Sequence, residues 1–264
     1  MTNEHLIADE GAQAAVPDVR RIGIGDLKDA LAKGLDDFKT MPTHLLFLCL
    51  IYPIVIVVMA RAFAGDKTMT LVFPLLAGYT LIGPLIATGM YELSRRRERG
   101  MDISRWHAFD PFKSMRIIPI IALGVVLMVF YVAWLAAAQA IFSLAFGNFV
   151  PDSPREFVEL ILTTSQGYTL IIVGSGVGLL FAVLVLTLSV VSFPMLLDRN
   201  VSVLTAIQTS IKAVIANPAT MLVWGLIVAV TLFIGSVPVF VGLAIALPVL
   251  GHATWHLYRK VVVS

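Results

Sequence analysis

PLIATGMYELSRRRERG, residues 84–100, is the stretch that decides how the rest of this chain is organised. An apolar, proline-bearing helix ends within it, and four arginines follow within five residues. Apolar helices flanked by Lys and Arg are typical of membrane spans, with the basic flank on the cytoplasmic side. The stretch therefore predicts a membrane boundary, with lipid before it, cytoplasm after it, and Tyr91 and Glu92 just inside the membrane.

The composition agrees with a membrane protein. The chain has 264 residues, of which 58% are hydrophobic and only 14% are charged, and its mean hydropathy is +0.90. A soluble domain is nearer half apolar and a quarter charged. Cys49 is the only cysteine, which excludes an intrachain disulfide and a Cys-based metal site. Residues 1–21 are polar and lack the apolar core of a signal peptide, so we expect a disordered cytoplasmic tail before a single membrane domain at 22–260.

Six apolar segments are long enough to cross a bilayer, which needs roughly 20 residues. They are expected at 44–64, 69–93, 117–146, 167–197, 218–236 and 238–258. The last two could form one over-long helix, but Gly235-Ser236-Val237-Pro238 is a turn signal that favours a hairpin. Residues 22–40 and 198–217 have apolar side chains at steps of three and four, which predicts amphipathic surface helices. Residues 147–166 are expected to form a loop. The predicted fold is an all-α, polytopic bundle.

The distribution of positive charge predicts the orientation. With six spans, sixteen of the 19 Lys and Arg residues lie on the side of the two termini and the long connectors. The excess of positive charge on one side places that side in the cytoplasm. We therefore expect both termini in the cytoplasm.

The second, fourth and sixth predicted spans share a proline pattern. Pro84, Pro194 and Pro248 are each followed, four and eight residues later, by polar side chains. These pairs are Thr88 with Glu92, Asp198 with Ser202, and His252 with His256. The pattern suggests about three parallel repeats of a surface helix, a span and a kinked span. The alternative is coincidence among proline-rich spans.

Four residues form a candidate polar cluster at the cytoplasmic interface: Glu92, Asp198, His252 and His256. Ionisable groups at membrane depth often line a pathway or a proton relay. The histidines have the spacing of metal or haem ligands, but Ala-Thr-Trp lies between them, so the glutamate of a zinc motif is missing. The alternative is an ordinary aromatic and basic belt at the interface.

Two further motifs have ordinary interpretations beside a functional one. Arg95, Arg96, Arg97 and Arg99 are candidate anchors for lipid headgroups, and they would also serve simply to set the topology. Gly174 and Gly178 have the spacing of a helix-packing face within a span. Nucleic-acid binding is not expected, because no soluble domain with interleaved aromatic side chains accompanies the arginines.

Several stretches together resemble a known family. They are Gly-Leu-Asp-Asp-Phe at 34–38, residues 78–100, Trp106 with Phe109, FPMLLDR at 193–199, and LPVLGHATWHLYR at 247–259. The chain resembles an uncharacterised bacterial family of predicted integral membrane proteins that carry a domain of unknown function. Some members are labelled as similar to a cytochrome c oxidase subunit. The resemblance implies location, in the bacterial inner membrane, and fold, but no activity.

The oxidase label is testable from the histidines. The chain has only five, none at the centre of a predicted span, whereas a catalytic oxidase subunit needs several to hold haem and copper. We expect a non-enzymatic protein without cofactor or metal, which is an accessory or assembly partner of a membrane complex such as a respiratory one. Its expected partners are membrane lipids and the subunits of that complex. The alternatives are a permease or lipid-handling protein with a cleft between repeats, and an enzyme acting on a lipid-linked substrate.

Overall fold

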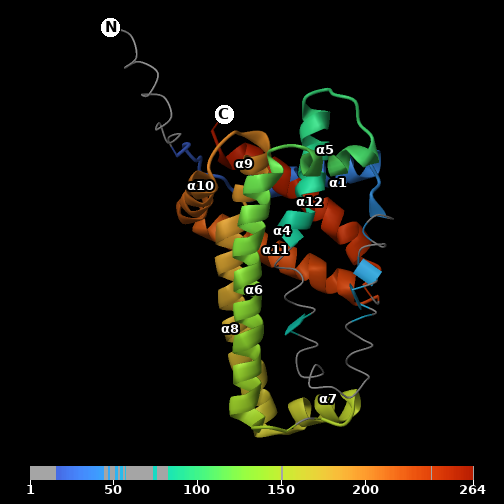
Figure 1. The fold of residues 1–264 in the computed structure, drawn as a ribbon, viewed down its shortest axis with the longest axis vertical. Helices are drawn as coiled ribbons and strands as arrows, with labels where there is room; N and C mark the ends of the chain where they lie inside the picture. Colours follow the sequence, from blue (N-terminus) through green and yellow to red (C-terminus); the bar gives the residue numbers. More distant parts are fainter. Residues whose placement is uncertain are drawn as a thin grey trace.

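A computed structural model describes residues 16–44, 47, 51–52, 54–55, 57, 74–75, 83–149, 151–238 and 240–263. The chain is all-helical, as predicted, and forms an elongated bundle (Figure 1). The first predicted span and most of the second lie outside the described residues. The described fold consists mainly of the helix near the N-terminus and of the elements from residue 83 onward.

Among the described residues, three long apolar helices have the length and composition of membrane spans. They are α6 (Ile117–Phe146), α8 (Ser165–Ser189) with its continuation α9 (Ser192–Asp198), and α11 (Pro218–Ser236). α6 and α8 run side by side along the length of the bundle (Figure 1). A Cβ atom added at Gly178 would lie 3.1 Å from the Trp134 ring, so this glycine lets the two helices approach closely. Six spans remain a prediction, as does the threefold repeat.

A break separates α8 from α9 within the predicted fourth span. Pro194 lacks a backbone N–H and clashes with the preceding turn, which disfavours a continuous helix there. Hydroxyl groups satisfy the interrupted backbone: Val191 N donates to Ser210 Oγ at 3.2 Å, and Ser192 Oγ donates to the Leu188 carbonyl at 2.6 Å. The residues of α9 from Ser192 to Leu197 are fully buried.

The segment expected to be a loop contains a helix, α7 (Pro154–Thr163). Ser153 Oγ caps it by accepting a hydrogen bond from Glu156 N at 3.2 Å, and Pro154 occupies the first turn, where its missing N–H costs nothing. Ser153 followed three residues later by Glu156, with Pro154 at the first helical position, is a helix-start signal, so the start of α7 was visible in the sequence. α7 lies at the end of α6 and α8 that is remote from the arginines (Figure 1).

The predicted hairpin near residue 236 is present. α11 ends at Ser236 and α12 (Leu243–Val261) begins seven residues later. The two helices meet at their glycines, because a Cβ atom on Gly242 would lie 2.8 Å from the Gly235 Cα atom. In Figure 1 this hairpin turns part of the way along α6, whereas α6 and α8 continue to α7.

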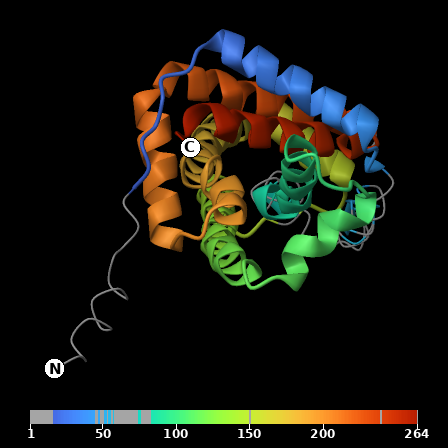
Figure 2. The ribbon, with the colours of Figure 1, turned by 90° about the horizontal axis from the view of Figure 1, so that it is seen from above.

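The opposite end, which we call the basic end, is closed by short helices. They are α1 (Ile24–Thr40), α4 (Gly83–Ile86), α5 (Thr88–Glu98), the 3₁₀ helix η3 (Arg105–Lys113) and α10 (Val203–Ala216). α1 lies along α12 (Figure 2). The contact is close: a Cβ atom on Gly34 would lie 2.6 Å from Ala253 N.

Residues 16–23 form an extended strap, whereas a disordered tail was expected up to residue 21. Val19 pairs with Val262, and Arg20 N donates to the Val261 carbonyl at 2.7 Å. The Asn217 side chain bonds both Ile22 N, at 2.8 Å, and the Arg20 carbonyl, at 2.9 Å. The strap thus joins the start of α1 to the C-terminal residues and to α11. Residues 1–15 lie outside the described part.

Candidate functional site at the basic end

α5 is the central element of the basic end. Its residues from Thr88 to Ser94 are buried, and a Cβ atom on Gly89 would lie 2.7 Å from the Ala108 carbonyl oxygen of η3. On its other side, a Cβ atom on Gly251 of α12 would lie 2.9 Å from Met90 Cβ. The helix ends at Gly100, whose φ of 63° is a left-handed conformation that glycine adopts without strain. The arginines of the decisive stretch therefore emerge between η3, α9 and α12.

The first polar network is centred on Asp37 of α1, which is only 3% exposed. Its Oδ2 atom accepts hydrogen bonds from Ser94 Oγ at 2.5 Å and from His256 Nε2 at 2.8 Å. Its Oδ1 atom accepts one from the Arg97 guanidinium at 2.5 Å. A single carboxylate thereby connects α1, α5 and α12.

His252 completes this Asp37 network. Its Nδ1 atom lies 2.8 Å from Ser94 Oγ. Because the Ser94 hydroxyl has one proton, and that proton goes to the carboxylate, His252 Nδ1 is the donor to the hydroxyl oxygen. Its Nε2 atom is buried without a hydrogen-bond partner among the described residues.

The charge state of Asp37 follows from its partners. Burial by itself would raise the pKa of this carboxyl, but the hydrogen bonds from His256, Ser94 and Arg97 outweigh it and lower the pKa from 3.8 to about 2. The hydrogen bond to Asp37 in turn raises the pKa of Arg97. Asp37 is therefore a buried, charged carboxylate at neutral pH.

A cavity of about 390 Å³ opens beside this network between α1, α5 and α12. It is lined by Lys33, Asp36, Asp37, Ser94, Arg97, Glu98, His256, Arg259 and Lys260. Its cations are already paired: Lys260 Nζ, for example, lies 3.2 Å from Asp26 and 2.9 Å from Asp29. The cavity is thus polar but close to electrically balanced.

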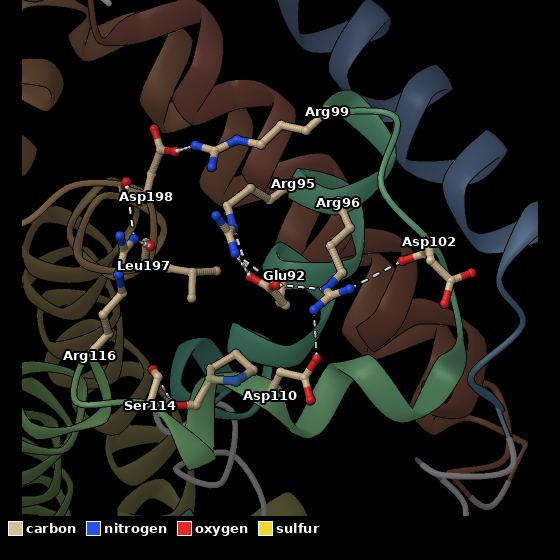
Figure 3. Close-up of polar contacts among 11 residues, drawn as sticks. Glu92, Arg95, Arg96, Arg99, Asp102, Asp110, Ser114, Arg116, Leu197 and Asp198 are labelled. Atoms are coloured by element: carbon tan, nitrogen blue, oxygen red, sulfur yellow. Dashed lines mark hydrogen bonds and ion pairs between the residues drawn. The ribbon is translucent and has the colours of Figure 1, made fainter.

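The second network surrounds Glu92, which is 2% exposed (Figure 3). Arg95 donates to both carboxylate oxygens, at 2.7 and 2.8 Å, and Arg96 Nε donates to Oε1 at 2.9 Å. Arg96 also reaches Asp110 of η3 at 2.8 Å and the Asp102 carbonyl at 3.2 Å. Glu92 is therefore neutralised by arginines of its own helix and helps to hold η3 in place.

The third network surrounds Asp198 at the end of α9 (Figure 3). Its carboxylate accepts hydrogen bonds from Arg99 at 2.8 Å and from Tyr258 Oη at 2.9 Å, and Arg259 approaches to 3.5 Å. Arg116, just before α6, donates to the Leu197 and Asp198 carbonyls. These bonds join α5, α6, α9 and α12.

The four predicted cluster residues therefore divide among separate networks. His252 and His256 come together, but through Asp37, while Glu92 and Asp198 each have their own arginines. Sequence reasoning missed Asp37 and Ser94. A signal existed for Asp37, because the buried positions of α1 are Leu27, Ala30, Gly34 and Asp37, one helical stripe at steps of three and four.

The four arginines proposed as lipid anchors are all used inside the protein. Arg95 and Arg96 pair with Glu92, Arg97 pairs with Asp36 and Asp37, and Arg99 pairs with Asp198. Among the described residues, no group of three or more His, Cys, Asp or Glu side chains is arranged to hold a metal ion. The contacts of the basic end therefore hold six elements together through buried charge.

These features define a class: an all-helical integral membrane protein whose basic end is closed by buried ion pairs. Within that class, residues 72–198 match the family described as "Predicted integral membrane protein (DUF2189)", which confirms the family resemblance of the sequence over that region. No curated protein and no solved structure matches the chain. The matched region contains Glu92, the four arginines and Asp198, whereas Asp37, His252 and His256 lie outside it.

Proposed function

We propose that this protein is a non-enzymatic component of the bacterial inner membrane that acts as an accessory or assembly partner of a membrane complex, such as a respiratory one. The observation that carries the proposal is the outward surface of α8. In the most apolar 18-residue stretch of α8, only 6% of the residues are buried inside the protein, against 28% in the corresponding stretch of α6. Apart from the face that packs against α6, most of the circumference of α8 is therefore free for lipid or for another protein.

The α8 surface has the form of a helix-packing site. Gly176 lies on it, and a Cβ atom added there would meet nothing within 4 Å. Large exposed side chains surround this glycine, among them Ile172, Leu179 and Leu180. A small residue between large apolar ones lets a second helix approach closely within the membrane.

The polar groups support association rather than turnover. Glu92, Asp37 and Asp198 are all held by internal hydrogen bonds and ion pairs. The segments α6, α8 and α11 contain no charged residue, although coupled transport usually requires one within the membrane. The distribution of Lys and Arg supports an orientation with the basic end, and with it both termini, in the cytoplasm.

The test is a photo-crosslinking amino acid placed at Leu180 of α8 and, as a matched control, at Val129 on the exposed side of α6. We expect a discrete protein adduct from position 180 in native membranes and only lipid adducts from position 129. Lipid adducts alone at both positions would refute an α8 partner.

A second pair of variants separates association from folding. Gly176→Leu fills open space, so the protein should fold normally but lose the partner on purification in mild detergent. Gly178→Leu should instead destabilise the protein, because the added atoms collide with the Trp134 ring. If Gly176→Leu retains every co-purifying protein, α8 is not the docking helix. An absorbance scan of the purified material for haem tests the respiratory association.

One observation favours the alternative, a lipid-handling protein. An apolar cavity of about 310 Å³ lies between α6, α7 and α8. Its lining includes Pro74, Trp134, Phe142, Phe157 and Gly174. A cavity of this composition suits an acyl chain. A lipid that co-purifies in stoichiometric amount with the wild type, and is lost from Gly174→Leu, would favour this function. Unselective bulk lipid in both would count against it.

A further inference from the structure

The 3₁₀ helix η3 exposes a row of large apolar side chains. Trp106 is 65% exposed and Met115, just after the helix, is 80% exposed. Phe109 and Phe112 lie between them and are also exposed. None of the networks described above uses these four residues, which we call the η3 ridge.

The ridge follows from the geometry of a 3₁₀ helix. With three residues per turn, side chains three positions apart lie directly above one another. Ala108 and Pro111 form the buried row, so the next row, Trp106, Phe109 and Phe112, points outward. The Trp106 and Phe109 rings are stacked, with centroids 6.3 Å apart. The aromatic side chains therefore form one continuous surface.

The ridge continues into the lipid-facing side of a membrane span. α6 begins at Ile117, two residues after Met115, and its first turns expose Ile118 and Ile121. η3 lies on the outer edge of the basic end, where it leads into α6 (Figure 2). The ridge is thus placed where α6 enters the bilayer.

The cations of η3 also have fewer and more distant carboxylate partners than those of α5. The Arg105 guanidinium lies 5.6 Å from the centroid of the Trp106 ring and has no carboxylate partner among the described residues. The Lys113 side chain is highly exposed, and its nearest carboxylate, Asp110, is 3.8 Å away. The arginines of α5, by contrast, are consumed in short internal ion pairs.

We propose that η3 is an interfacial anchor: its ridge inserts at the boundary between headgroups and acyl chains, and Arg105 and Lys113 bind the phosphates of anionic lipids. Aromatic and basic side chains together are typical of this depth in a bilayer. The anchor sets the depth of α6 and holds the basic end against the membrane surface. This inference is independent of the function proposed for α8.

The test uses the fluorescence of the full chain reconstituted in vesicles. Three of the four tryptophans, Trp134, Trp224 and Trp255, are buried, so subtraction of a Trp106→Phe variant isolates the signal of Trp106. We expect lipids brominated near the ester linkage to quench this signal more than lipids brominated near the chain end, and aqueous iodide to quench it little. Strong quenching by iodide with none by brominated lipid would overturn the anchor.

The headgroup contact needs its own comparison. The Trp106 emission should lie further to the blue in vesicles that contain added phosphatidylglycerol than in vesicles of phosphatidylcholine alone. Arg105→Gln with Lys113→Gln should abolish this difference. Lys28→Gln with Lys39→Gln removes the same charge from exposed positions of α1 and should leave the difference intact.

Two outcomes would overturn the headgroup contact: no difference between the vesicles, or equal loss in both double variants. Exposure of Trp106 to iodide in vesicles, but not in native membranes, would show that a protein partner covers the ridge instead. Should Trp106→Phe fold poorly, subtracting the wild-type signal from that of a Phe112→Trp variant places the probe two turns along the ridge and repeats the measurement.

Discussion

Acidification should release α1 from α12 through Asp37. This carboxyl has a pKa of about 2 in the folded protein, against 3.8 as an isolated group. Because the pKa is lowered by folding, the charged carboxylate stabilises the docked α1 fully above pH ~4, and this stabilisation is lost as the pH falls through about 2. One pKa unit corresponds to about 1.4 kcal/mol, so the contribution is about 2 kcal/mol.

That energy predicts a measurable change in local opening. A loss of about 2 kcal/mol raises the open fraction of α1 by roughly 30-fold. Amide hydrogen exchange of α1 in detergent, read by mass spectrometry from pH 5 to pH 2 and corrected for the intrinsic exchange rate, would detect it. The exchange of α6 is the internal reference, because α6 contains no ionisable group with a lowered pKa.

Two variants make the measurement specific. Asp37→Asn removes the charge and should show the increased opening already at pH 5, with little further change on acidification. Asp36→Asn alters the neighbouring, exposed carboxylate, which also pairs with Arg97, and should open α1 by well under 1 kcal/mol. If the wild type and Asp37→Asn lose protection in parallel between pH 4 and pH 2, the reasoning about Asp37 is wrong.

Three other substitutions follow from the same structure. Gly34→Leu should detach α1, because even a Cβ atom at this position would collide with Ala253. The detached α1 should then be cut by protease. Gly25→Ala, at a position where nothing lies within 4 Å of an added Cβ atom, is the control that should stay resistant. Glu92→Gln leaves two arginines without their charge partner and should lower stability by about 3 kcal/mol, seen as a fall in the midpoint of thermal unfolding in detergent. Asn217→Ala should cost about 1–2 kcal/mol and free the strap, so that protease cuts residues 16–23 first; unchanged resistance would argue against its role.

Much of the helical framework was predictable from local patterns. The apolar run at 117–146 predicted α6 with its observed bounds, and the spacing of Leu27 and Leu31 predicted a helix at 22–40, of which 24–40 is helical. The Gly-Ser-Val-Pro signal predicted the turn after α11. Each pattern reports on a few consecutive residues, and hydropathy and helical period act at that range.

Other features were only partly legible. α7 lies where a loop was expected, although Ser153 and Glu156 form a capping signal that marks the start of a helix. The strap at 16–23 has no periodicity of its own, and its conformation is held by Val262 and Asn217 from the far end of the chain. A segment of this kind has no local sequence pattern that predicts its conformation.

The sequence by itself determined that this is a helical membrane protein with a strongly basic end, because long apolar runs and clustered Lys and Arg have few other physical solutions. Only the tertiary structure decided how that charge is used. Glu92 pairs with arginines of its own helix, and Asp198 pairs with Arg99, which is 99 residues away in the sequence. The two histidines lie at the carboxylate of Asp37, which is 219 residues from His256. Which charges pair depends on which helices pack together, and the α1–α12 contact at Gly34 is set by steric fit between residues far apart in the chain.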